Sequence, residues 1–229
     1  MLKGYGAVIL DGAWLTLQLA LSSMALAIVL GLIGVSMRLS PVRWLAWLGD
    51  LYSTVIRGIP DLVLILLIFY GGQNLLNNVA PMLGYDDYID LNPFSAGVFT
   101  LGFIFGAYLS ETFRGAFMAI PKGQAEAGMA YGMSRSQVFF RVLVPQMIRL
   151  AIPGFTNNWL VLTKATALIS VVGLQDMMFK AKQAADATRE PFTFFLAVAA
   201  LYLVMTSVSL LALRQLEKRY SVGVKVAEL

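Results

Sequence analysis

Residues 122–145, KGQAEAGMAYGMSRSQVFFRVLVP, form a polar and basic segment between two long apolar runs of the chain. Their first half, 122–133, is rich in small residues and predicts a short helix with a low surface, broken at Gly132. Ser134 followed by Gln137 matches a capping box and predicts a second helix that ends before the closing proline. Helix, glycine break and helix predict a stiff protrusion, which is either a docking element for another protein or an ordinary surface hairpin.

The composition places most of this chain in a lipid bilayer. Of its 229 residues, 59% are hydrophobic and only 13% are charged, whereas a soluble domain is roughly half apolar and a quarter charged. Cysteine and histidine are absent, which excludes disulfides, thiol nucleophiles, an imidazole base and Cys/His metal sites. The net charge of +4 does not indicate nucleic-acid binding, because the basic residues gather beside the apolar runs.

Five apolar runs meet the length of roughly 20 residues that a membrane-spanning helix requires. The predicted spans are residues 13–37, 62–76 (extended backward to 56), 94–118, 147–174 and 192–213. The first run is too long for the core of a cleavable signal peptide and is read as a span. The sequence therefore predicts an all-α membrane protein with one transmembrane domain over residues 1–229.

The distribution of Lys and Arg predicts the orientation in the membrane, because positive connections face the cytoplasm. The charged residues of the second connection are all acidic and those of the fourth are of both signs, whereas those of the first, the third and the tail are mainly basic. The basic sets are Arg38, Arg43 and Arg57; Arg114, Lys122, Arg135, Arg141 and Arg149; and Arg214, Lys218, Arg219 and Lys225. We therefore expect the N-terminus outside, residues 119–146 inside and the C-terminus inside.

Residues 41–57 predict a separate amphipathic helix at the membrane interface, with Trp44 and Trp47 on its apolar stripe. The chain then breaks at Arg57-Gly58-Ile59-Pro60-Asp61. Pro60 suits a first helical turn, and Asp61 suits the positive end of a helix dipole.

No phosphate-binding loop of the type GxxxxGK[ST] occurs in the sequence, so the chain is not read as an ATPase. Active transport would need a partner that supplies the energy. A stand-alone secondary transporter or channel is the main alternative, but the chain shows no clear internal repeat. A membrane enzyme or assembly factor is a third possibility, but the sequence shows no set of catalytic residues that would act together. Five spans make a thin pathway, which favours a second membrane subunit.

The polar segment resembles the "EAA" loop of ABC importer permeases, with the spacing E-A-A, three residues, G, nine residues and an apolar-x-apolar-P close. Here it reads Glu126-Ala127-Gly128, then Gly132, then Val142-Leu143-Val144-Pro145. One departure is Gly128, which stands where a second alanine is usual and is expected to loosen the first helix. The resemblance implies that a cytoplasmic ATPase docks on this loop through Lys122, Gly123, Glu126, Ala127, Gly128, Gly132 and Pro145.

The resemblance covers nearly the whole chain. Residues 57–60, 111–116 and 164–168 look like segments of polar amino acid permeases, and residues 219–225 are similar to the "Q" permeases of histidine and lysine/arginine/ornithine importers. It implies the type I ABC importer fold in a bacterial inner membrane. The partners would be a related permease, an ABC ATPase dimer that holds ATP and Mg²⁺, and a periplasmic binding protein; the chain itself would bind no cofactor. The implied function is import of polar, in particular basic, L-amino acids (arginine, ornithine, lysine, histidine) by alternating access.

Polar side chains are concentrated in the fourth span, which is expected to be broken in its first half at Pro153-Gly154. Asn158, Thr163, Lys164 and Thr166 are the candidates for a substrate pathway. Lys164 could instead pair with a carboxylate or carbonyl of a neighbouring helix. Many permeases of this family carry Glu after the matching Asn; this chain has no carboxylate there, so we expect the partner permease to supply it.

Two further sets are predicted near the cytoplasmic side. Glu111 and Arg114, three residues apart, form either a structural pair or a gate, and Arg57, Pro60 and Asp61 are assigned the same structural or gating role. Gly102-x-x-x-Gly106 predicts close packing against a neighbouring helix.

Overall fold

The computed structural model describes residues 2–85 and 87–220, and within these ranges all regular structure is helical. The elements are α1 (Gly6–Arg38), α2 (Arg43–Gly58), α3 (Asp61–Val79), η1 (Ala80–Leu83), α4 (Pro93–Met118), α5 (Lys122–Ala130), α6 (Arg135–Val138), η2 (Phe139–Leu143), α7 (Val144–Ala165), η3 (Thr166–Val172), α8 (Met177–Thr188) and α9 (Pro191–Tyr220). Five segments of the described chain are long and apolar enough to cross a membrane. The prediction of five spans is therefore confirmed, although the first helix begins at Gly6, earlier than expected.

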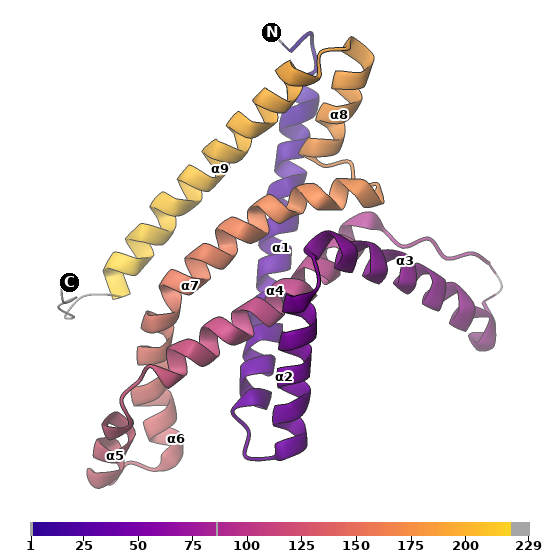
Figure 1. Ribbon diagram of the computed structural model, residues 1–229. Helices are drawn as coiled ribbons and strands as arrows, with labels where there is room; N and C mark the ends of the chain where they lie inside the picture. The colour runs from indigo at the N-terminus through magenta and orange to yellow at the C-terminus, as the bar shows by residue number, and fades with distance from the viewer. Residues whose placement is uncertain (1, 86, 221–229) are drawn as a thin grey trace.

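Glycines and other small residues let α1 and α4 approach closely, and this pair forms the centre of the fold (Figure 1). A Cβ atom on Gly102 would lie 2.6 Å from the side chain of Leu26, and one on Gly106 would lie 2.8 Å from Leu30 and from the Tyr52 hydroxyl. The close-packing role predicted for Gly102 and Gly106 is confirmed, and the helix that packs against them is α1.

The backward extension of the second span to residue 56 is wrong. Helix α2 ends at Gly58, Ile59 is extended, and α3 begins at Asp61 with Pro60 as its N-cap. The reason is that Pro60 disfavours the helical conformation of the residue before it. Helix α2 runs beside the end of α1 (Figure 1), burying Gly49, Ser53 and Ile56 and leaving its tryptophan stripe exposed; its place at a membrane interface stays a prediction.

The expected break in the first half of the fourth span is also wrong. Helix α7 continues through Pro153 and Gly154, and its geometry changes only at Thr166, where the 3₁₀ segment η3 begins. Gly154 lies against Thr112 of α4, since a Cβ there would meet the Thr112 methyl at 2.6 Å. Residues 153–154 therefore serve close helix packing, while the chain bends away after Ala165.

Helix α8, which the sequence reasoning missed, packs on α1 and α9 at the end of the molecule where the N-terminal turn lies (Figure 1). The Asp176 carboxylate caps it by accepting from the Phe179 N–H at 2.9 Å. A Cβ on Gly12 would lie 2.8 Å from the backbone of Met177, so α1 and α8 touch through main chain. Helices α5 and α6 lie at the opposite end (Figure 1). Asp86 and the tail motif after Tyr220, including Lys225, fall outside the described residues.

Candidate functional site

Helices α5 and α6 form the predicted helix–break–helix and project below the ends of α4 and α7 (Figure 1). Helix α5 ends at Ala130, and Gly132 takes φ +81°, a left-handed conformation that costs a residue with a side chain roughly 1–2 kcal/mol. The capping box is confirmed: the Gln137 N–H donates to the Ser134 hydroxyl at 3.3 Å, and the Ser134 N–H donates to the Gln137 side chain at 2.8 Å.

The surface of this protrusion is open to a partner. Lys122, Gly123, Glu126 and Ala127 are exposed along α5, and Tyr131 at the turn is 92% exposed. The nearby large apolar side chains Met118, Met129 and Phe140 are exposed as well. Small and charged residues beside exposed apolar side chains suit contact with another protein better than contact with water alone.

Gly128 departs from this pattern, because it is buried against α6. A Cβ on it would lie 3.0 Å from a methyl of Val138. The expectation that Gly128 loosens the first helix is wrong, since α5 continues through it to Ala130. Glycine here lets α5 and α6 lie closer together.

The helix predicted to end before Pro145 does not end there. The π-helical turn η2 leads directly into α7, and Pro145 occupies the first turn of α7. The π-helical turn shifts the backbone pairing just before it, since the Val144 N–H donates to the Phe139 carbonyl five residues back, and such local adjustments accommodate a proline that has no N–H. The loop is thus joined to the fourth span without a flexible connection.

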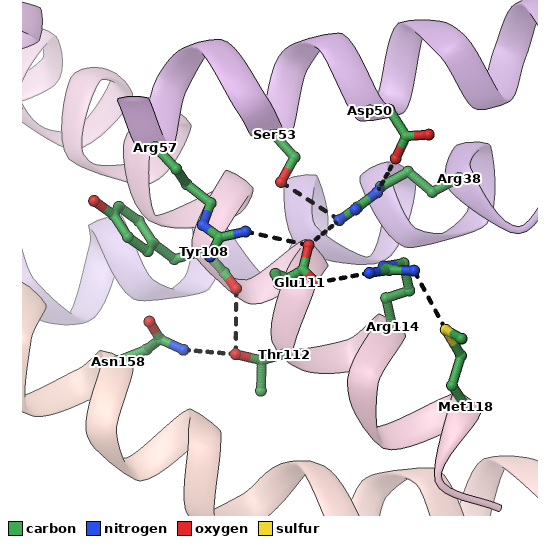
Figure 2. Close-up of polar contacts among 10 residues, drawn as sticks. All are labelled: Arg38, Asp50, Ser53, Arg57, Tyr108, Glu111, Thr112, Arg114, Met118 and Asn158. Atoms are coloured by element: carbon green, nitrogen blue, oxygen red, sulfur yellow. Dashed lines mark hydrogen bonds and ion pairs between the residues drawn. The ribbon is translucent and has the colours of Figure 1, made fainter. Parts of the chain in front are cut away.

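A cluster of charges ties α1, α2 and α4 together (Figure 2). One Glu111 carboxylate oxygen lies 2.6 Å from Arg38 and 3.2 Å from Arg57, and the other lies 2.9 Å from Arg114. Arg38 also contacts Asp50 at 2.7 Å. The predicted pair of Glu111 and Arg114 is confirmed, but the sequence reasoning missed Arg38 and Asp50, because such tertiary pairs leave no spacing signal in one sequence.

Polar contacts continue from this cluster toward α3 and α7. The Arg57 guanidinium lies 5.9 Å from the centre of the Tyr108 ring, and the Tyr108 hydroxyl lies 3.5 Å from a carboxylate oxygen of Asp61. On the next turn, the Thr112 hydroxyl donates to the Tyr108 carbonyl at 3.2 Å and accepts from the Asn158 amide at 2.9 Å (Figure 2). Tyr108 and Thr112 were not among the predicted site residues.

The four pathway candidates on the fourth span differ in accessibility. Asn158 is 8% exposed, and Thr163 and Thr166 are fully buried; the two threonine hydroxyls donate to carbonyls within the same span. Lys164 is exposed on α7 and makes no ion pair with the described residues. The structure therefore does not bring these side chains together in one cavity of this chain.

Outside the spans, burial raises the pKa of the Asp176 carboxyl to about 6, although backbone N–H groups partly oppose the shift. One of its oxygens has no hydrogen-bond partner within the described chain. As for metals, no group of three or more carboxylates in residues 2–85 and 87–220 could hold an ion.

Known proteins match both the sequence and the fold. Residues 15–222 match the family "Binding-protein-dependent transport system inner membrane component". The chain belongs to this family. It is a multi-pass membrane protein with the permease fold of ABC importers.

Individual relatives match over all or nearly all of their length. The chain is 52% identical to the histidine/lysine/arginine/ornithine transport system permease protein HisQ of Escherichia coli K12, over 100% of both chains. It is 38% identical to the octopine transport system permease protein OccQ of Rhizobium radiobacter, over 97% of this chain and 94% of that one. Among solved structures, an amino acid ABC transporter crystallised with histidines matches with a TM-score of 0.81 at 29% identity, over 94% of this chain and 95% of that one.

Proposed function

We propose that this chain is the membrane permease of an ATP-driven importer for basic L-amino acids, namely arginine, ornithine, lysine and histidine. The full-length similarity to a permease named for histidine, lysine, arginine and ornithine supports this substrate class. In this proposal a periplasmic binding protein delivers the substrate, and the chain passes it to the cytoplasm by alternating access. The N-terminus is periplasmic and the C-terminus is cytoplasmic, in keeping with the basic connections.

The observation that carries the proposal is the protrusion formed by α5 and α6. It is a short helical pair with an exposed, low surface, closed by a glycine turn and joined stiffly to α7. An ATPase subunit that holds this pair in a groove would move α7 when ATP closes the ATPase dimer. Glu126, on the exposed side of α5, is the charged contact in this interface, while ATP and Mg²⁺ stay on the ATPase.

A second, related permease completes the pathway in this proposal. Lys164 supports it, because an exposed cation in a membrane span is costly unless it meets an opposite charge or water. Val161 and Val171 are also exposed on this span. We assign this surface of α7 and η3 to the pathway between two permeases, where Lys164 meets either a partner carboxylate or the substrate carboxylate.

Purification of the tagged chain from its native membrane in mild detergent, with identification of all co-purifying chains, tests the assembly. We expect an ABC ATPase and a second permease. Recovery of the chain alone, still transporting without ATP, would instead support a secondary transporter.

Two substitutions test the docking surface in reconstituted vesicles. Glu126→Lys reverses the exposed charge, and Gly132→Trp places a large side chain at a left-handed turn. Both are expected to uncouple ATP hydrolysis from uptake while the complex still reaches the membrane. Normal uptake by both variants would exclude α5 and α6 as the docking element.

A further inference from the structure

The membrane spans hold few carboxylates, and one of them stands apart. The described acidic residues of the five spans are Asp11, Asp61, Glu111 and Glu217. Asp11 pairs with Lys180, Glu111 pairs with three arginines, and Glu217 lies in the last turn of α9, at the end of its span. Asp61 has no ion pair within the described residues, and an unpaired carboxylate in a span is costly without a function.

The arginine nearest in sequence does not neutralise Asp61. Arg57 directs its guanidinium to Glu111, at 3.2 Å (Figure 2). Glu111 thereby engages Arg57 together with Arg38 and Arg114. Arg57 forms no ion pair with Asp61 within the described residues, so the carboxylate oxygens of Asp61 stay open to another cation.

The position of Asp61 is fixed and accessible. It is the first residue of α3, directly after Pro60, and its side chain is partly exposed. Within the described residues, its side chain accepts one hydrogen bond, from the Tyr108 hydroxyl at 3.5 Å, which is long for a hydrogen bond. A carboxylate can accept about four hydrogen bonds, so most of its acceptor capacity is unused.

Asp61 also lies at one end of a continuous polar strip. The strip runs from Asp61 on α3 through Tyr108 and Thr112 on α4 to Asn158 on α7. The Tyr108 hydroxyl donates to Asp61, the Thr112 hydroxyl donates to the Tyr108 carbonyl, and the Asn158 amide donates to the Thr112 hydroxyl. Polar strips across several helices in a membrane protein face a water-filled cavity or a partner rather than lipid. Such a strip suits the lining of a transport pathway between α3, α4 and α7.

We propose that Asp61 binds the cationic side chain of the substrate, a guanidinium or an ammonium group, during its passage through the permease. The inference rests on the proposed import of basic amino acids and adds the residue of this chain that selects for charge. It replaces the expectation that a carboxylate for the cation must come only from the partner permease. A guanidinium matches the two oxygens of a carboxylate in a bidentate geometry.

The test uses the complete complex of this chain with its co-purifying subunits, without binding protein. Equilibrium binding of labelled L-arginine and of L-citrulline, its uncharged isostere, is measured for the wild type, Asp61→Asn and Asp61→Glu. Glu217→Gln serves as the control, because it also removes a carboxylate from a span. We expect Asp61→Asn to weaken arginine binding about tenfold or more and to change citrulline binding less than about twofold. Asp61→Glu and Glu217→Gln should keep the wild-type ratio.

The outcomes separate this inference from the proposed function. A wild-type complex that binds and imports no basic amino acid would refute the proposed function itself. Wild-type binding of arginine with an unchanged arginine-to-citrulline ratio in Asp61→Asn would refute the role of Asp61 alone. Loss of the second permease from the purified Asp61→Asn complex would also refute it, since Asp61 would then be a subunit contact.

Discussion

Arg38 Nη1 lies 2.6 Å from Glu111 Oε2 and joins the last residue of α1 to α4, 73 positions later in the chain. The Arg38 side chain is only 8% exposed, so this ion pair is shielded from water. Glu111 lies on the part of α4 that leads into the α5–α6 protrusion. The pair therefore holds the second half of α4, which leads into the protrusion, against α1. Asp50 and Arg57 hold it against α2 as well.

The first prediction concerns this carboxylate. Glu111→Gln leaves three guanidinium groups without their shared anion, whereas Arg114→Gln removes one partly exposed partner three residues away on the same helix. We expect Glu111→Gln to lower the free energy of unfolding by about 1–3 kcal/mol, since Glu111 is itself 30% exposed. Arg114→Gln should cost about 0.5 kcal/mol or less.

Thermal unfolding of the purified complex in detergent measures both variants. Equal melting temperatures for Glu111→Gln and Arg114→Gln would contradict the central place of Glu111. Raising the salt concentration should affect the exposed Arg114 contact more than the shielded Arg38 contact.

The difference between local and tertiary signals explains what the sequence could predict. Spans, the capping box at Ser134 and the pair Glu111–Arg114 follow from spacing within one segment, and all three are confirmed. The contacts of Glu111 with Arg38 and Arg57 depend on how α1, α2 and α4 pack, which spacing does not encode. The break expected at Pro153 is wrong for a similar reason: α7 continues through it, and the close contact of Gly154 with Thr112 of α4 is a tertiary feature that spacing does not encode.

The second prediction compares two glycines of the protrusion. Gly128→Ala places a methyl 3.0 Å from Val138, a contact that a small shift relieves, while alanine favours the helix by about 1 kcal/mol over glycine. Gly132→Ala meets no neighbour but must adopt φ +81°, at a cost of about 1–2 kcal/mol. We therefore expect Gly128→Ala to keep coupled ATPase activity near the wild-type level and Gly132→Ala to reduce it.

Substrate-stimulated ATP hydrolysis and uptake in the same vesicles measure the coupling of both glycine variants. The reverse order, with Gly128→Ala the more damaging, would mean that the surface of Gly128 itself meets the ATPase. Its burial against α6 would then not hold in the assembled complex.

The third prediction concerns Asn158. Its amide donates to the Thr112 hydroxyl and to the Gly154 carbonyl, both at 2.9 Å, at a position that is 8% exposed. Asn158→Ala removes both bonds and should cost about 1–2 kcal/mol of stability. Asn158→Asp should cost more at neutral pH, because a buried carboxylate would face the Gly154 carbonyl. Melting temperatures test the order, and a more stable Asn158→Asp variant would show that the amide instead points toward a cation.

The fourth prediction is a pH dependence that Asp176 controls. Burial raises the pKa of this carboxyl from 3.8 to about 6, so the folded protein binds the proton more tightly than the unfolded chain does. The contribution of Asp176 to the free energy of unfolding should therefore rise as the pH falls from about 7 toward 4, by up to about 3 kcal/mol. Asp176→Asn keeps a side chain that can cap α8 but carries no charge, and it should lose this pH-dependent gain in stability.

The measurement is the difference in melting temperature between wild type and Asp176→Asn at pH 7.5 and at pH 5, because the effects of the other carboxylates cancel in that difference. A gap that stays constant with pH would mean that the Asp176 carboxylate is solvated or paired with a cation in the assembled transporter.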